Sequence, residues 1–134
     1  MFTEKKPYIL GIIPARGGSK RLSRKNVKLL DGRPLIDYVI KAGGQCDLIT
    51  ELIVSTDDKE IKQVALSCGA NVPFLRPKEL ARDTSTTEEV IKHSILSIEN
   101  SFGNVVDVVV LLQPTSPFTS VKLINHCVEL LINE

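Results

Sequence analysis

The sequence predicts an α/β fold: a parallel, mixed Rossmann-like sheet with helices on both faces. Short apolar runs alternate four times with segments of helical periodicity, which is the pattern of strands joined by right-handed crossover helices. The chain has 134 residues, 43% hydrophobic and 25% charged, which suits one globular domain. A polar segment follows each apolar run, and ligands bind such sheets beyond the carboxyl ends of the strands. We therefore expect a binding site at that edge of the sheet.

Apolar runs rich in β-branched residues predict four strands, at residues 8–14, 52–55, 72–75 and 105–112. The first run ends in a proline, and the second and third are short. The run at 105–112 is almost uniformly apolar and β-branched, as is typical of a strand covered on both faces. We therefore expect residues 105–112 to form a central strand.

Helical periodicity between capping and terminating residues predicts four helices, at residues 32–44, 56–69, 84–102 and 120–132. The first has a proline near its start, and the first two end in glycine. Asp57 with Glu60, and Thr86 with Glu89, have the spacing of a capping box. Asp57 and Asp58 could instead be metal ligands, but the capping pattern favours Asp57 as the N-cap.

Positive charge is concentrated near the start of the sequence. The net charge is only +1, which gives no support to a general nucleic-acid-binding surface. Eight of the 17 Lys and Arg residues nevertheless lie between Lys5 and Lys28, and no Asp or Glu occurs between Lys5 and Asp31. This distribution predicts a local anion site.

The segment IIPARGGSKRLSRKN, residues 12–26, has the donors that polyphosphate recognition needs. Gly17 and Gly18 permit positive φ and close backbone approach, so their N–H groups could form an anion nest with the Ser19 hydroxyl. Arg16 and Lys20 add a guanidinium and an ammonium group. The segment contains neither GxxxxGK[ST] nor GxGxxG, which argues against a P-loop or a dinucleotide fingerprint. The alternative is a solvated basic turn. The anion nest is favoured over it, because the glycine pair directly follows a buried strand.

The cysteines, the first apolar run, one aspartate and the two histidines indicate the cellular compartment and limit the chemistry that we expect. The odd number and wide spacing of the cysteines indicate neither a disulfide framework nor a zinc site. The first apolar run is too short for a signal peptide or a membrane span, so we expect a cytoplasmic protein without a membrane partner. Asp83 is at least as suited to ordering a loop as to chemistry. His93 and His126 lie within predicted helices, and packing or surface roles suit them best.

Four segments in this order and spacing carry a resemblance to a known family: IIPARGGSKRLSRKN, STDDKEI, LRPKELARDTSTTEEVI and LLQPTSPF. They resemble the N-terminal part of the N-acylneuraminate cytidylyltransferases, or CMP-sialic acid synthetases. The resemblance covers essentially the whole chain, so residues 1–134 are expected to be the nucleotide-binding part of a single cytidylyltransferase domain. It implies a fold of the nucleotide-diphospho-sugar transferase type. It also implies a Mg²⁺-dependent reaction in which CTP and a nonulosonic acid give a CMP-sugar and pyrophosphate.

The resemblance also implies roles for individual residues. The expected triphosphate-binding set is Arg16, Ser19, Lys20 and Lys25. Asn26 would lie near the ribose, Pro14 and Ala15 at the cytosine edge, Arg76 against the nucleotide, and Thr87 and Gln113 near the sugar acid. Arg16, Lys20 and Lys25 would be catalytic, because fixed cations that meet the charge growing on pyrophosphate stabilise the transition state more than the ground state.

Departures from the family pattern limit what the resemblance implies. Ser23 stands where the family usually has proline. Family members are longer, and their metal-binding aspartates and dimerisation segment are expected in the part that would follow Glu134. We therefore expect a truncated chain with no metal ligand of its own and weak or no activity. The alternatives are a non-catalytic nucleotide-binding module and a 3-deoxy-manno-octulosonate cytidylyltransferase, and the sequence does not identify the nonulosonic acid.

Overall fold

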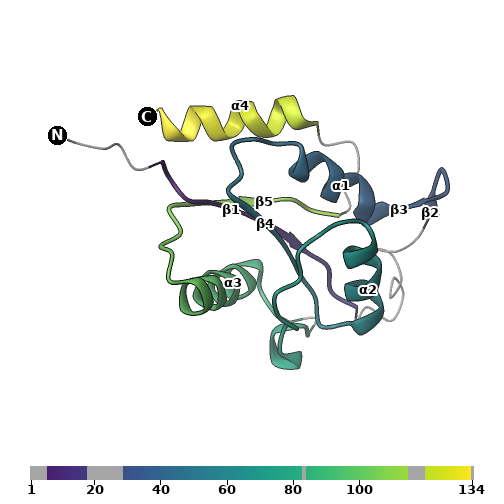
Figure 1. The fold of residues 1–134 in the computed structure, drawn as a ribbon. Helices are drawn as coiled ribbons and strands as arrows, with labels where there is room; N and C mark the ends of the chain where they lie inside the picture. Colours follow the sequence, from purple (N-terminus) through teal and green to yellow (C-terminus); the bar gives the residue numbers. More distant parts are fainter. Residues whose placement is uncertain (1–5, 18–28, 83, 115–119, 134) are drawn as a thin grey trace.

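The computed structural model describes residues 6–17, 29–82, 84–114 and 120–133, and it has the predicted α/β architecture (Figure 1). Three parallel strands form the main sheet of the described residues, in the order β4–β1–β5. They are β1 (Ile9–Pro14), β4 (Glu51–Ser55) and β5 (Val108–Leu111). A two-stranded antiparallel hairpin consists of β2 (Leu29–Leu30) and β3 (Arg33–Pro34). The helices are α1 (Leu35–Gly44), α2 (Lys59–Ser67), α3 (Thr87–Phe102) and α4 (Val121–Ile132), and a 3₁₀ turn, η2, spans Lys78–Leu80.

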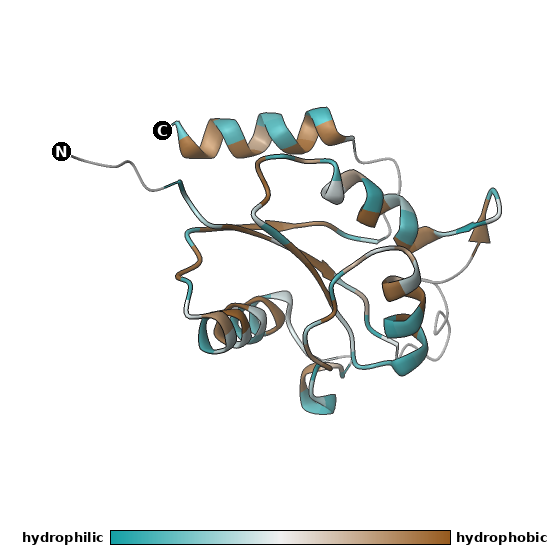
Figure 2. Ribbon diagram, in the orientation of Figure 1, coloured by the Kyte–Doolittle hydropathy of each residue, from teal (hydrophilic) through white to brown (hydrophobic). Residues whose placement is uncertain are grey.

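Helices cover both faces of the sheet because the side chains of β1 alternate between them. Ile9 and Ile13 pack in a core with residues of α1, α2 and α4, whereas Leu10 and Ile12 pack in a second core with Ile98 of α3. All five side chains are at most 2% exposed. Figure 2 shows the apolar sides of the helices turned toward the sheet. The central strand is therefore β1, and its carboxyl end is fixed from both sides.

Two glycines allow α1 to pack closely against the sheet. A Cβ atom on Gly11 of β1 would lie 2.8 Å from Cδ1 of Leu52, and one on Gly43 of α1 would lie 2.9 Å from Cδ2 of Leu52. Neither distance is tolerable for a real side chain. Leu52 therefore occupies the space that glycine leaves on both elements.

Helix α2 begins one residue later than predicted. Asp58, not Asp57, is its N-cap: the Asp58 carboxylate accepts hydrogen bonds from the N–H groups of Glu60 and Ile61 at 2.8 and 3.1 Å. The capping assignment of Asp57 was therefore wrong, because its carboxylate accepts from the Gly17 N–H instead. The cap predicted for α3 is confirmed, with Thr86 Oγ1 accepting from the Glu89 N–H at 3.1 Å.

Two strand predictions also need correction. Residues 72–75 form no strand: one parallel bridge joins Asn71 to Ile53, and the segment then leaves the ladder at Pro73, which has no N–H to donate. The strand expected at 105–112 is shorter and lies at an edge of the described sheet rather than at its centre. Val105 is 72% exposed, so part of that apolar run is not core.

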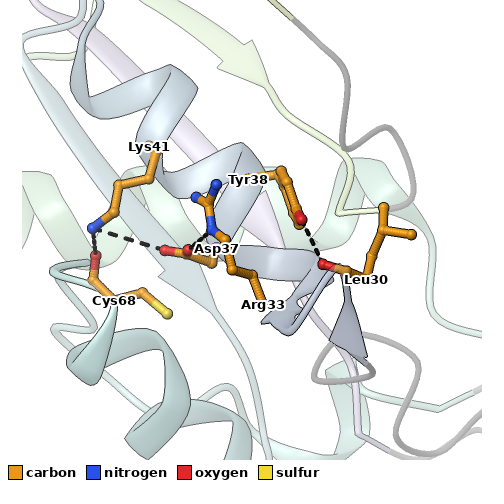
Figure 3. A network of polar contacts seen from close by, with 6 residues as sticks. All are labelled: Leu30, Arg33, Asp37, Tyr38, Lys41 and Cys68. Carbon is orange, nitrogen blue, oxygen red and sulfur yellow. Dashed lines mark hydrogen bonds and ion pairs between the residues drawn. The ribbon is translucent and has the colours of Figure 1, made fainter.

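A polar network joins the β2–β3 hairpin to α1 and α2 (Figure 3). Arg33 Nε donates to Asp37 Oδ2 at 2.7 Å, and the Arg33 guanidinium lies 4.3 Å from the centre of the Tyr38 ring. The Tyr38 hydroxyl donates to the carbonyl of Leu30. Lys41 Nζ donates to the Cys68 carbonyl at 2.8 Å, at the end of α2. The network therefore fixes the hairpin on the body of the domain.

No helix among the described residues is both long enough and apolar enough to cross a membrane.

Candidate functional site

A cavity of about 250 Å³ lies at the carboxyl ends of the strands, where the fold class predicts a ligand. We call it the arginine cavity, because three arginines from separate places in the chain contribute to its wall. Its described lining residues are Pro14, Arg16, Arg76, Arg82, Ser85, Thr86, Thr87, Val90 and Gln113. No Asp or Glu is among these lining residues, so the cavity favours an anionic ligand.

A larger hollow of about 900 Å³ is a weaker candidate. All its described lining residues lie between Ser120 and Glu129, on α4 and its N-cap. Its charged side chains include both Lys122 and Glu129, and it brings no groups together from separate strands. The arginine cavity is therefore the better candidate, because polar groups converge on it from several elements.

Arg76 is the most constrained side chain in the arginine cavity, with only 5% of its surface exposed. Its Nε donates to Ser55 Oγ at 3.1 Å and its Nη2 to the Ser55 carbonyl at 2.8 Å. Its Nη1 donates to the Leu80 carbonyl at 3.3 Å. These acceptors are neutral oxygens, so they fix the orientation of the guanidinium without cancelling its charge.

The electrostatic surroundings of Arg76 are unfavourable to a cation. Burial is the main cause that lowers the pKa of Arg76; Asp57 opposes this shift, and Arg16 adds to it. An arginine nevertheless stays protonated in a protein. An anion in the cavity would relieve both the desolvation of Arg76 and its repulsion with Arg16.

Arg16 is held at the end of β1 by hydrogen bonds on either side of it. The Ala15 N–H donates to the Ser55 carbonyl at 2.9 Å, and the Gly17 N–H donates to Asp57 Oδ1 at 3.0 Å. The φ of Gly17 lies outside the left-handed region. Glycine is needed there for close approach instead, because a Cβ atom would lie 2.5 Å from Asp58 Cβ.

Arg82 is a cavity residue that the sequence reasoning did not select. Ser85 orders its turn: Ser85 Oγ accepts from the Arg82 N–H at 3.0 Å and is 3.2 Å from the Glu79 carbonyl, to which it donates. The signal that could have indicated Arg82 is its place in the LRPKELARDTSTT segment, which also contains the selected residues Arg76 and Thr87. Asp83 itself lies outside the described residues.

Comparison with known proteins identifies the family to which the chain belongs. The family model described as Cytidylyltransferase matches residues 10–134. The chain belongs to the cytidylyltransferase family. Several of its curated relatives carry names that specify nonulosonic acids.

Three curated relatives illustrate the range. The CMP-N,N'-diacetyllegionaminic acid synthase of Legionella pneumophila is 48% identical over 125 residues, which are 91% of this chain and 52% of that protein. The pseudaminic acid cytidylyltransferase of Campylobacter jejuni is 39% identical over 90% of this chain and 51% of its own length. The N-acylneuraminate cytidylyltransferase of Escherichia coli O18:K1:H7 is 43% identical over 91% of this chain and 28% of its own length. The cytidylyltransferase chain thus spans about half or less of these relatives.

Solved structures support the fold. A CMP:2-keto-3-deoxy-manno-octonic acid synthetase complexed with CTP superposes with a TM-score of 0.79 at 22% identity, over 95% of this chain and 48% of that one. The 4-diphosphocytidyl-2C-methyl-D-erythritol synthase of Anaerococcus prevotii superposes with a TM-score of 0.68 at 17% identity, over 95% and 52%. The nucleotide-diphospho-sugar transferase type of fold expected from the sequence is therefore confirmed.

The structure brings together most of the described residues that the sequence selected. Those that line the arginine cavity are Pro14, Arg16, Arg76, Thr87 and Gln113. Ala15 is fully buried and does not line it, and its N–H is already bonded to Ser55. Pro14 does line the cavity but has no N–H, so it offers a base only its carbonyl oxygen. The predicted residues Ser19, Lys20, Lys25 and Asn26 lie outside the described residues.

The described residues do not form a metal site. No group of three His, Cys, Asp or Glu side chains among them could hold a metal ion. Asp57 accepts from Gly17, and Asp58 caps α2. Both carboxylates are thus engaged by backbone N–H groups, and the Mg²⁺ ligands expected after Glu134 remain a prediction.

Proposed function

We propose that this cytidylyltransferase chain binds CTP with the phosphates in the arginine cavity, as the nucleotide-binding half of an enzyme that transfers CMP to a nonulosonic acid. The observation that carries the proposal is the convergence of Arg16, Arg76 and Arg82 on a cavity without a carboxylate among its described lining residues. Three guanidinium groups around one cavity suit a polyphosphate better than a neutral ligand. The names of the relatives supply the nucleoside and the acceptor class.

The proposed reaction needs no covalent enzyme intermediate. The anomeric hydroxyl of the sugar acid attacks the α-phosphorus of CTP and loses its proton to water as the new O–P bond forms, and the bond from the α-phosphorus to the bridging oxygen breaks to release pyrophosphate. Arg16, together with Lys20 and Lys25, would meet the negative charge that grows on the leaving group. Arg76 is already oriented by Ser55, so it costs little reorganisation when the phosphates arrive.

The remaining residues divide between the two substrates. Ser19 and Asn26 would contact the triphosphate and the ribose, and Pro14 would face the cytosine, with Ala15 buried next to it in the chain. Thr87 and Gln113 enter the arginine cavity from α3 and from the end of β5, and we assign them to the sugar acid. Mg²⁺ would be held by ligands outside the described residues and would help to neutralise the phosphates. The full enzyme would work in the cytoplasm as a homodimer, with no nucleic-acid or membrane partner.

The first alternative is a non-catalytic nucleotide-binding module, which would bind CTP without transferring CMP. The 3-deoxy-manno-octulosonate alternative has weaker support, because a structural likeness at 22% identity shows the fold alone.

Nucleotide titration followed by turnover tests the proposal. Calorimetry of the chain with CTP and GTP should show tighter binding of CTP, and equal affinity would contradict the cytidine assignment. Incubation with CTP, Mg²⁺ and each of sialic, legionaminic and pseudaminic acid then tests for release of pyrophosphate. CTP binding without turnover would favour the nucleotide-binding module for this chain.

A further inference from the structure

The carboxylate of Asp57 is unusual among the acidic groups of the domain, because it lies beside the arginines without lining their cavity. Its Oδ1 accepts from the Gly17 N–H at 3.0 Å, across 40 residues of sequence. Asp57 also acts electrostatically on Arg76, and so does Arg16. The carboxylate therefore lies next to the backbone that carries Arg16 and within electrostatic range of Arg76.

The contact with Gly17 closes a two-point attachment around Arg16. On one side the Ala15 N–H donates to the Ser55 carbonyl at 2.9 Å, and on the other the Gly17 N–H donates to Asp57. Ser55 is the last residue of β4, and Asp57 follows it by two residues. Both attachments therefore come from the same short stretch of chain. The backbone of Arg16 cannot shift without breaking one of them.

We propose that Asp57 is a positioning residue for the anion site: by holding Gly17 it fixes the backbone of Arg16, so that the Arg16 and Arg76 guanidinium groups converge on one phosphate group. This inference rests on the proposed binding of a polyphosphate, but not on the identity of the base. Asp57 acts through Gly17 and Arg16, and the ligand is not expected to touch it.

A substitution at Gly17, the other partner of the contact, tests the same proposal independently. Its missing side chain leaves room for Asp58, and an added Cβ would lie 2.5 Å from both Cβ and Oδ2 of Asp58. Gly17→Ala should therefore push the segment off the end of β4 and have the same effect on anion binding as loss of the Asp57 carboxylate.

The test compares Asp57→Ala with Asp57→Asn, because the amide oxygen of asparagine can still accept from the Gly17 N–H. Calorimetry would measure inorganic tripolyphosphate, CTP and cytidine against each variant. Asp57→Ala should weaken tripolyphosphate and CTP by about ten-fold, the effect of one net hydrogen bond. Asp57→Asn should stay within about three-fold of the wild type, and cytidine should be unaffected in both.

The control is Asp47→Ala, which removes an exposed carboxylate before the start of β4, away from the cavity. A thermal unfolding scan identifies variants that fail to fold, and Gly17→Ala then replaces Asp57→Ala. Equal tripolyphosphate affinity of Asp57→Ala and wild type would overturn the proposal, as would equal losses in Asp57→Ala and Asp57→Asn. Failure of the wild type to bind tripolyphosphate would also overturn it. Equal wild-type affinity for CTP and GTP would contradict only the proposed function.

Discussion

The guanidinium of Arg76 donates two hydrogen bonds to a single residue, Ser55, through its side chain and its backbone carbonyl. Ser55 is fully buried at the end of β4, and its carbonyl also accepts from the Ala15 N–H beside Arg16. One residue thus connects the two arginines that the proposed triphosphate site depends on.

Replacement of Arg76 should damage both binding and folding. Arg76→Ala removes a buried cation and leaves Ser55 Oγ and the Leu80 carbonyl without the donor they have in the wild type, which should cost about 1–3 kcal/mol of unfolding free energy. CTP affinity should fall at least about ten-fold, because a charge-assisted contact is lost. Urea denaturation and calorimetry measure the two effects.

The matched control is Arg82→Ala in the same cavity. Arg82 is exposed, so its removal should weaken CTP binding while the unfolding free energy changes by less than about 0.5 kcal/mol. An Arg76→Ala variant as stable as Arg82→Ala would show that the buried hydrogen bonds contribute nothing.

Ser55→Ala isolates the hydroxyl contact from the carbonyl contact. The substitution removes the acceptor of Arg76 Nε and keeps both hydrogen bonds to the Ser55 carbonyl. We expect a loss of about 1 kcal/mol in stability and a CTP affinity about five-fold lower. Chemical denaturation and calorimetry check this, and a loss as large as that in Arg76→Ala would contradict the division between the two acceptors.

His93 should make stability depend on pH. Its ring meets Phe74 edge-on at 4.8 Å between centroids, and its buried Nδ1 has no hydrogen-bond partner among the residues that the structure describes. Burial is the main cause that lowers the pKa of His93; Arg76 adds to the shift, and Glu79 opposes it. The unfolded chain therefore takes up the proton more readily, so stability is lost as pH falls through the ordinary histidine range near ~6.5.

Denaturation curves between pH 8 and pH 5 test this directly. His93→Gln should have a shallower slope of unfolding free energy against pH than the wild type. His126→Gln is the control, because it removes an exposed histidine on α4 and leaves His93 in place. An unchanged slope in His93→Gln would mean that other groups cause the pH dependence.

Adjacent glycines near the end of α1 should respond oppositely to alanine. In Gly43→Ala the new Cβ would lie 2.9 Å from Leu52 Cδ2 and 3.0 Å from Leu112 Cδ1, and overpacking of this kind costs about 1–3 kcal/mol. In Gly44→Ala the Cβ would meet nothing within 4 Å, so helix propensity should stabilise the protein by up to about 1 kcal/mol. Thermal unfolding of the two variants checks the pair, and equal effects would contradict the close packing of α1.

The sequence predicted the elements whose signals are local. The helix start at Thr86 follows from a side chain that bonds to its own first turn. The cap of α2 was misplaced by one residue, because the capping-box spacing of Asp57 and Glu60 favours Asp57 locally. The contact of Asp57 with Gly17, 40 residues away in sequence, accompanies capping by Asp58 instead.

The sequence also predicted part of the candidate site. Its position at the carboxyl ends of the strands follows from the fold class, and five of the selected residues do line the cavity, namely Pro14, Arg16, Arg76, Thr87 and Gln113. The roles of Ser55 and Asp57 were not predictable, because each depends on a contact between distant segments. Arg82 was missed because an exposed arginine in a polar loop has no distinguishing local pattern.

A crystal structure of the chain with CTP would test directly whether the triphosphate binds in the arginine cavity. We predict phosphate oxygens about 2.7–2.9 Å from the guanidinium nitrogens of both Arg16 and Arg76, with the Asp57 contact to Gly17 retained. Nucleotide density bound elsewhere, such as in the hollow along α4, with both arginines free of phosphate, would contradict it.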